Sequence, residues 1–309
     1  MAITSIPLAR HDADFEGFAA DLGGSFERYG FAVIEAHGLP IDLLAAADAD
    51  AKAFFALPEP AKRRYQIPGG AGQRGYTPFG IETAKGAEHA DLKEFWHIGR
   101  DLPAGHVQGG AIAPNVWPSE ITGFRTSLSG LYAALDTLGL KVLRGIARHV
   151  GLETDHFAPI VADGDSVLRL LRYPPVAGPT GAVRAAAHED INAITLLLGA
   201  DEAGLELLDR DGTWLAVDPS PGAVVVNIGD MLQRLTNHVL PSTTHRVVNP
   251  TPERSGEARH SMPFFLHFAP DYLIRTLPGC VGPGRPDRYR EPITARAYLD
   301  ERLREIGLA

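Results

Sequence analysis

The sequence predicts a mainly β fold with flanking helices (α+β), built around a β-sandwich or jelly roll. Two observations support this fold class. Apolar residues recur at helical spacing over about the first half of the chain. Beyond residue 165 they form short β-branched or Leu-rich runs, separated by turn residues at intervals of about ten. No linker poor in apolar residues divides the chain, so we expect its parts to pack together.

The helical predictions follow from apolar residues three or four positions apart. Phe18, Leu22 and Phe26 fall on one helical face, and a longer stretch after Pro118 repeats Leu in the same way. Ser119, next to Glu120, is a suitable helix start. The expected helices cover residues 14–29, 41–57, 119–150 and 294–306, with a short strand at 30–36 between the first two.

The strand predictions depend on short apolar runs bounded by turns. Gly212 ends the sequence Asp-Arg-Asp-Gly between two such runs, which indicates a hairpin, and a Pro-Ser-Pro-Gly turn covers 219–222. Short runs that alternate sides need two facing sheets to bury their inner residues. The expected strands cover 166–173, 194–198, 205–208, 214–217, 223–228, 244–248 and 261–268.

Composition excludes several classes of function. The 309 residues carry a net charge of −9, which disfavours a nucleic-acid or anionic-membrane partner. The single cysteine, Cys280, excludes an internal disulfide, a zinc finger and an iron–sulfur cluster. The first residues lack a basic and apolar leader, and no apolar run is long enough to span a membrane, so we expect a soluble, cytoplasmic protein.

Common catalytic motifs are missing from the sequence. It contains no Gly-x-Ser-x-Gly, no phosphate-binding Gly-x-x-x-x-Gly-Lys-Ser/Thr, no Gly-x-Gly-x-x-Gly before a helix and no His-Glu-x-x-His. Serine hydrolases, nucleotide-triphosphate enzymes, nicotinamide enzymes and zinc peptidases are therefore not expected.

One ordered set of residues in the β half indicates metal chemistry. His188 and Asp190 are two positions apart, so on a strand they would share a face, and His245 follows in a second strand-like run. Two imidazoles and one carboxylate form the facial triad of non-haem iron(II), which leaves positions open for substrates. Arg259 and Ser261 would likewise share a strand face and could hold a carboxylate. Each pair alone is common, but their order on one predicted sandwich points to a site.

The chain resembles the isopenicillin-N-synthase-like branch of the iron(II)/2-oxoglutarate-dependent oxygenases over nearly its whole length. Besides the residues above, the resemblance rests on Arg28-Tyr29-Gly30-Phe31, His37-Gly38-Leu39-Pro40, Arg74-Gly75-Tyr76, Asp91-Leu92-Lys93-Glu94-Phe95, Arg172-Tyr173-Pro174-Pro175, Asn227-Ile228-Gly229-Asp230 and Leu235-Thr236-Asn237.

The resemblance implies a double-stranded β-helix and specific residue roles. His188, Asp190 and His245 would bind Fe(II), while Arg259, Ser261 and Tyr173 would hold the distal carboxylate of 2-oxoglutarate. The implied reaction uses O2 to hydroxylate or oxidise a small molecule, with decarboxylation of 2-oxoglutarate to succinate. The implied parts are an N-terminal module at 1–115, a long helical segment at 116–164, the jelly-roll core at 165–270 and a C-terminal helical extension at 271–309.

Two other functions stay open. Glu189 between the first two ligands, and Arg172 before Tyr173, look more like isopenicillin N synthase itself, which is an iron(II) oxidase without 2-oxoglutarate. In that case Arg259 and its neighbours would hold a substrate carboxylate. The other alternative is a sugar- or ligand-binding β-sandwich with an incidental metal site.

The remaining motifs are expected to be structural. Asn227, Gly229 and Asp230 would shape a strand end, His37 would be a hydrogen-bonded loop residue, and the charged group Asp91, Lys93 and Glu94 would lie on the surface. Candidates for the substrate wall are Tyr76, Phe79, Phe95, Trp96 and Arg100. We expect a monomer or weak dimer.

Overall fold

Two β-sheets face one another at the centre of the computed structural model, which describes residues 3–70, 72–81, 91–175, 184–198, 204–249 and 256–305. The large sheet has the strand order β1-β2-β10-β7-β12-β5-β4-β3. These strands are, in that order, Ser5–Pro7, Phe31–Glu35, Val224–Ile228, Ile194–Leu198, Arg259–Leu266, Val167–Tyr173, Glu94–Gly99 and Gly75–Thr77. The small sheet has the order β6-β11-β8-β9, with bounds Ala185–His188, His245–Val247, Leu205–Leu208 and Trp214–Ala216.

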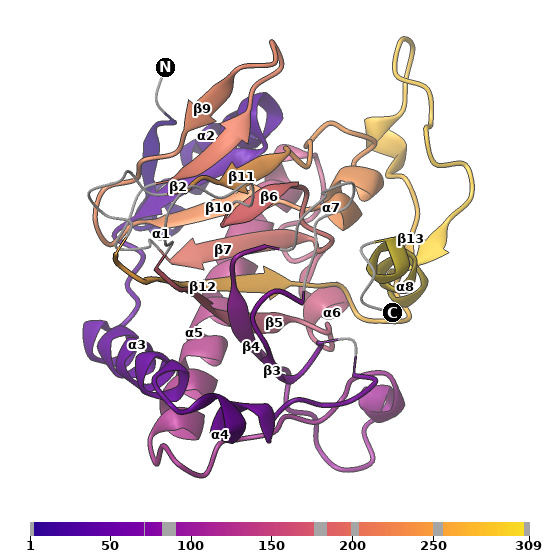
Figure 1. Cartoon of the computed structure of the whole chain (residues 1–309). Coiled ribbons are helices and arrows are strands. Elements are labelled where there is room, and N and C mark those ends of the chain that lie inside the picture. The colour runs from indigo at the N-terminus through magenta and orange to yellow at the C-terminus, as the bar shows by residue number, and fades with distance from the viewer. Residues whose placement is uncertain are drawn as a thin grey trace.

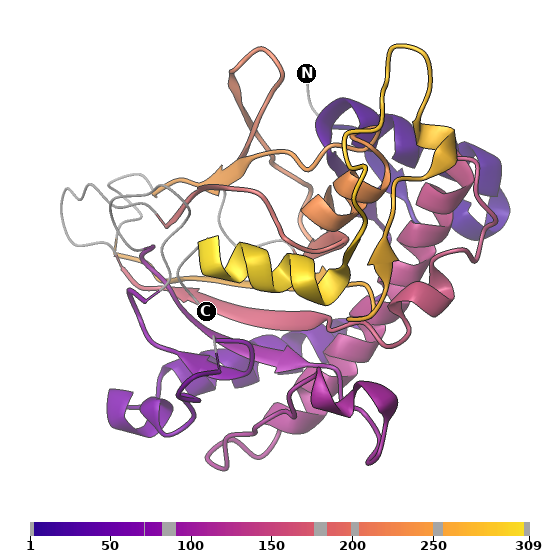
Figure 2. The same cartoon turned by 90° about the vertical axis from the view of Figure 1, so that its right-hand side faces the viewer.

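Helices cover the outer face of the large sheet. The 26-residue α5 (Phe124–His149) runs behind this sheet, and α2 (Phe15–Tyr29) and α3 (Ile41–Phe55) pack on α5 (Figures 1 and 2). Gly139 lets α5 approach β12, because a Cβ there would lie 2.4 Å from Leu266 Cδ1. Shorter elements complete the fold: α1 (Arg10–Ala13), α4 (Glu59–Arg63), α6 (Ala158–Val161), α7 (Asp230–Leu235), α8 (Ala295–Glu305), β13 (Leu273–Ile274), β14 (Ile293–Thr294) and 3-10 turns at Val107–Gly110 and Pro278–Cys280.

The position of β10 between two layers explains why Val224, Val225 and Val226 follow one another without a polar residue. Val224 and Val226 belong to the core that includes the helices, whereas Val225 belongs to the core shared with the small sheet. A strand that is buried on both faces needs apolar residues at every position rather than at alternate ones. Together with its neighbour β7, the strand β10 forms one wall of the space between the two sheets.

The predicted fold class is confirmed, and most predicted elements lie where the sequence places them. The hairpin between β8 and β9 forms as expected, with Gly212 at φ +86. The sequence interpretation gave no bounds for β1, β3, β4, β6, β13 and β14, and it missed the short helices α1, α4, α6 and α7. It also began the long helix at Ser119, whereas α5 starts at Phe124 and the backbone N–H of Ser119 donates to the hydroxyl of Tyr65.

The two ends of the large sheet come from outside the predicted core at 165–270. Strands β1 and β2 form one end, and β4 and β3 form the other. The N-terminal part of the chain therefore completes the central sheet on both sides, and the four-part division stays a prediction. Among the helices that the structure describes, none combines the length and apolar character required to cross a membrane.

Candidate active site

The three predicted metal ligands converge between the sheets. His188 ends β6 and His245 begins β11, and the two residues face each other as antiparallel neighbours with ring centroids 4.4 Å apart. Asp190 Oδ1 lies 3.9 Å from His188 Nε2, and its Oδ2 lies 3.9 Å from His245 Nε2. One ligand atom from each residue lies within 4.8 Å of the other two. Asp190 reaches the site from the loop after β6, so the argument from strand alternation was wrong for this residue.

Backbone carbonyls fix the orientation of both imidazoles. The Nδ1 of His188 is 2.7 Å from the carbonyl of Ala186, and the Nδ1 of His245 is 3.1 Å from that of Thr243. A carbonyl only accepts, so each Nδ1 carries the proton and donates it, which leaves the lone pair on Nε2. Both Nε2 atoms therefore suit a metal ion between the two rings.

The electrostatics of the site favour a neutral imidazole at His188 and an ionised carboxylate at Asp190. Desolvation and the proximity of His245 lower the pKa of His188 to about 4. Burial alone would raise the pKa of Asp190, but the two histidines and hydrogen bonds from Asn227 and Thr195 outweigh it and lower that pKa. Metals bind deprotonated ligands, so His188 and Asp190 are both in the form that a divalent cation needs at neutral pH.

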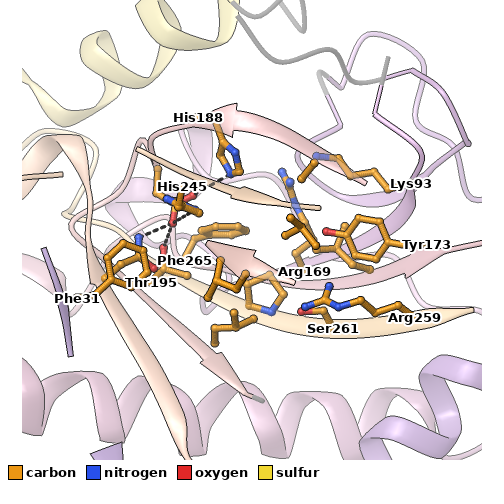
Figure 3. Close-up of a pocket in the computed structure, with 18 residues that line it drawn as sticks. Phe31, Lys93, Arg169, Tyr173, His188, Thr195, His245, Arg259, Ser261 and Phe265 are labelled. Atoms are coloured by element: carbon orange, nitrogen blue, oxygen red, sulfur yellow. Dashed lines mark hydrogen bonds and ion pairs between the residues drawn. The ribbon is translucent and has the colours of Figure 1, made fainter. Parts of the chain in front are cut away.

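The triad lies at one end of a pocket, and the residues predicted to bind a carboxylate lie at the other (Figure 3). Arg259 and Ser261 project from β12, and Tyr173 comes from the adjacent β5, directly opposite Arg259. The Arg259 guanidinium carbon is 5.2 Å from the centre of the Tyr173 ring. All three side chains are buried, so a dicarboxylate that spans the pocket would meet a metal at one end and a guanidinium at the other.

The charged segment before β4 is not a surface feature, which corrects the sequence interpretation. Asp91, Lys93 and Glu94 are only 4%, 5% and 1% exposed. Lys93 Nζ donates to Asp91 over 2.8 Å, and the other oxygen of Asp91 accepts from the backbone of Ala186 beside the metal ligands. These charges are buried because each has a partner, and the Asp91 contact ties the segment to β6.

Two cations of the pocket wall were missed by the sequence interpretation. Lys93 and Arg169 both line the pocket, and Figure 3 shows them above Arg259. Arg169 lies between the rings of Phe95 and Phe265, with its guanidinium carbon 4.4 and 5.0 Å from their centres. Its position four residues before Tyr173, on the same face of β5, was a usable signal.

None of the five proposed substrate-wall residues lines this pocket. Tyr76 and Trp96 are fully buried in the helical core, and Arg100 forms a bidentate contact with Asp136. Phe79 is exposed, and Phe95 does not line the pocket but packs behind its wall against Leu171, Tyr173 and Arg169.

His37, in contrast, is the hydrogen-bonded loop residue that the sequence predicts. Its ring bonds the carbonyl of Gly222 over 2.7 Å and accepts from the backbone of Leu39. His37 therefore serves the loop and takes no part in the triad.

Comparisons with known proteins agree with this geometry. Residues 164–268 match the family profile of the 2OG-Fe(II) oxygenase superfamily. Residues 3–120 match the profile described as non-haem dioxygenase in morphine synthesis N-terminal. Together the two profiles cover the N-terminal part of the chain and the sheets that hold the site.

Named relatives and solved structures match almost the whole chain. Proline hydroxylase buaE of Petromyces alliaceus is 34% identical over 303 residues, which are 93% of each chain. The 2-oxoglutarate-Fe(II) type oxidoreductase hxnY of Emericella nidulans is 34% identical over 87% of this chain and 79% of its own. A putative 2OG-Fe(II) oxygenase family protein of Caulobacter crescentus superposes with a TM-score of 0.93, at 58% identity and 99% coverage of both chains. A full-length Neurospora crassa protein in complex with alpha-KG gives a TM-score of 0.87, at 28% identity over 98% of this chain and 95% of that one.

Proposed function

Because this chain belongs to the 2OG-Fe(II) oxygenase superfamily and is an Fe(II)/2-oxoglutarate-dependent dioxygenase, we propose that His188, Asp190 and His245 are its iron ligands. The supporting observation is the convergence of their ligand atoms, with the Nδ1 of each histidine bonded to a backbone carbonyl so that its Nε2 is left for a metal. Bound iron(II) would supply the activation of O2 for oxidation of a substrate, coupled to decarboxylation of 2-oxoglutarate to succinate.

Arg259, Ser261 and Tyr173 would position 2-oxoglutarate. The guanidinium offers a planar pair of N–H donors to a carboxylate, and the buried hydroxyls of Ser261 and Tyr173 can add neutral hydrogen bonds. The pocket wall excludes water around these donors, which strengthens each contact. The distal carboxylate would thus be held at the far end from the triad, which orients the molecule along the pocket.

The cosubstrate-free oxidase is disfavoured. Relatives are named 2-oxoglutarate-dependent dioxygenases, and the similar Neurospora crassa structure contains alpha-KG. The pocket is small and internal, which suits a small-molecule substrate. The net charge of −9 supports the absence of nucleic-acid and membrane partners, and a single buried cysteine suits the reducing cytoplasm. We also propose a monomer or weak dimer.

The test of the ligands compares two neighbouring carboxylates. Asp190→Asn should lose tight Fe(II) binding and turnover, and alanine at either histidine should do the same while the fold is retained. Glu189→Gln is the matched control, because Glu189 does not line the pocket and its carboxylate accepts from the hydroxyl of Thr244. Wild-type iron affinity and succinate release in Asp190→Asn would contradict the proposed ligand set.

A further inference from the structure

We infer that Thr195 and Asn227 are positioning residues that make Asp190 a ligand through one oxygen only. This inference rests on the proposed ligand set, since it concerns how Asp190 would meet the metal. It assigns a task to Asn227, for which the sequence predicted only a structural role, and to Thr195, which the sequence interpretation did not single out.

Both hydrogen bonds to Asp190 end on the same oxygen. Thr195 Oγ1 donates to Asp190 Oδ2 over 2.5 Å, and Asn227 Nδ2 donates to the same Oδ2 over 2.8 Å. The distances to the imidazoles do not choose between the oxygens, because each oxygen is 3.9 Å from one Nε2. The hydrogen bonds distinguish the two oxygens, because the two donors use both lone pairs of Oδ2 and leave Oδ1 for the metal.

Asn192 fixes the direction of the threonine proton. Asn192 Nδ2 is 2.8 Å from Thr195 Oγ1. An ionised carboxylate only accepts, so the hydroxyl proton of Thr195 must point to Asp190, and Asn192 must then donate to the hydroxyl oxygen. The side chains of Asn192, Thr195 and Asp190 are all buried, so water does not compete for these contacts.

The register of the large sheet places the two donors together. Thr195 on β7 and Asn227 on β10 are directly opposed in the antiparallel pair, so their side chains lie on the same face. Gly229 then lets the Asp190 loop come close, because a Cβ at this position would lie 2.1 Å from Asn192 Oδ1 and 2.2 Å from the Asn192 carbonyl. The φ of Gly229 is −102, which any residue can adopt. Glycine is therefore required at this position because there is no space for a side chain.

Single-oxygen ligation determines how many positions stay open. A carboxylate may bind a cation through one oxygen or two. With one oxygen, the triad fills three positions of a six-coordinate ion, whereas with two oxygens it fills four. Thr195 and Asn227 would therefore keep the second oxygen of Asp190 from occupying the third open position.

The experiment uses Co(II), added anaerobically to the metal-free full-length protein. Thr195→Val removes the donor and keeps the shape of the side chain, Asn227→Ala removes the other donor, and Thr195→Ser is the matched control because it retains the hydroxyl. Loss of an outer contact of this kind typically lowers metal affinity 10- to 100-fold. We expect such a loss in Thr195→Val and Asn227→Ala, together with a changed visible Co(II) spectrum, because the second oxygen of Asp190 would replace one solvent ligand of the ion. Thr195→Ser should resemble the wild type.

The outcomes separate this inference from the proposed ligand set. If Asp190→Asn binds Co(II) as the wild type does, the ligand set is wrong. If Asp190→Asn loses Co(II) while Thr195→Val and Asn227→Ala keep wild-type affinity and spectrum, only the present inference is overturned. Should Thr195→Val fail to fold, as judged by near-UV circular dichroism, Asn227→Ala decides the question by the same two measurements.

Discussion

The guanidinium of Arg259 is held in place by the sheet before any ligand arrives. The residue lies in the middle layer of the molecule on β12, opposite Tyr173, and its burial removes competition from water. A charge-assisted contact in such a place is worth about 1.5–3 kcal/mol. This magnitude gives a direct prediction for the binding of 2-oxoglutarate.

Arg259→Ala should weaken 2-oxoglutarate binding roughly ten- to hundredfold in the anaerobic Fe(II) protein. Arg259→Lys keeps the charge but loses the planar pair of donors, so it should restore only part of the affinity. Ser261→Ala removes a neutral hydrogen bond and should cost about 1 kcal/mol. The measurement is a titration followed by visible absorbance.

Iron affinity is the internal control for these three variants. None of the altered side chains is a proposed ligand, so Fe(II) should bind each variant as it binds the wild type. An unchanged affinity for 2-oxoglutarate in Arg259→Ala would contradict the proposal that Arg259 binds this cosubstrate.

Single residues of the site were predictable where chemistry restricts residue type. A facial triad admits few side chains, so His188, Asp190 and His245 stood out by type and order. Lys93 was placed on the surface because lysine is rarely buried without a partner, and the contacts that bury it involve Asp91 and the distant Ala186 backbone. A local pattern contains no information about contacts across about a hundred residues.

At the scale of elements, β4 depends on a buried ion cluster. Lys62 Nζ donates to Glu94 Oε2 over 2.6 Å, and Arg172 donates to Glu94 Oε1 over 2.6 Å. Tyr76 on β3 also donates to Glu94. Burial alone would raise the pKa of Glu94, but these hydrogen bonds outweigh it and lower that pKa.

Glu94→Gln should destabilise the protein by about 3 kcal/mol at pH 7, because it leaves buried cations without their charged partner. The control is Glu59→Gln, which removes a half-exposed carboxylate that is 3.4 Å from the same Lys62. Water screens a pair whose carboxylate is half-exposed, so this contact should contribute at most about 1 kcal/mol. Denaturant unfolding of both variants would measure the difference.

The pH dependence of this cost has a defined sign. The folded pKa of Glu94 lies below its unfolded value, so its contribution is fully present above the unfolded pKa and is lost as the pH falls through the folded one. The stability gap between wild type and Glu94→Gln should therefore shrink in acid. A gap that stays constant down to pH 3 would contradict this account.

Strand β4 was missed for a physical reason. The sequence of β4 places Glu94 and His97 within an apolar run, which locally resembles a charged surface more than a strand. The two polar side chains are tolerated because Arg172 and Arg169 on the adjacent β5 bond them. Strands with alternate or continuous apolar residues, such as β7 and β10, were predicted because their burial needs no distant partner.

At the scale of the whole molecule, the N-terminal part protects both edges of the central sheet. Strand β2 pairs with β10, and β4 pairs with β5. A fragment of residues 165–270 would expose β10 and β5 as long apolar edges, which favour pairing between molecules. The site residues lie within that range, but the sheet that carries them is completed by other segments.

The fragment 165–270 should therefore aggregate or stay unfolded, whereas the full chain should unfold in one cooperative transition. Size-exclusion chromatography and circular dichroism of both proteins would measure this. A soluble, folded fragment that binds Fe(II) would show that the core is independent of the N-terminal part. The matched fragment 1–115 should also fail to fold alone, because β2 would lack its partner β10.

The same strand order determines when the protein can fold during synthesis. Phe31 on β2 pairs with Asn227 on β10, so the two halves of this contact leave the ribosome roughly two hundred residues apart. Until β10 emerges, β2 has no antiparallel neighbour in the large sheet. Through most of translation the nascent chain thus carries an apolar strand with one edge open, a state in which chaperone binding competes with aggregation. Thr195 and Asn227, the two donors to Asp190, come together only when β10 has been made. This happens after about three quarters of the chain has been synthesised.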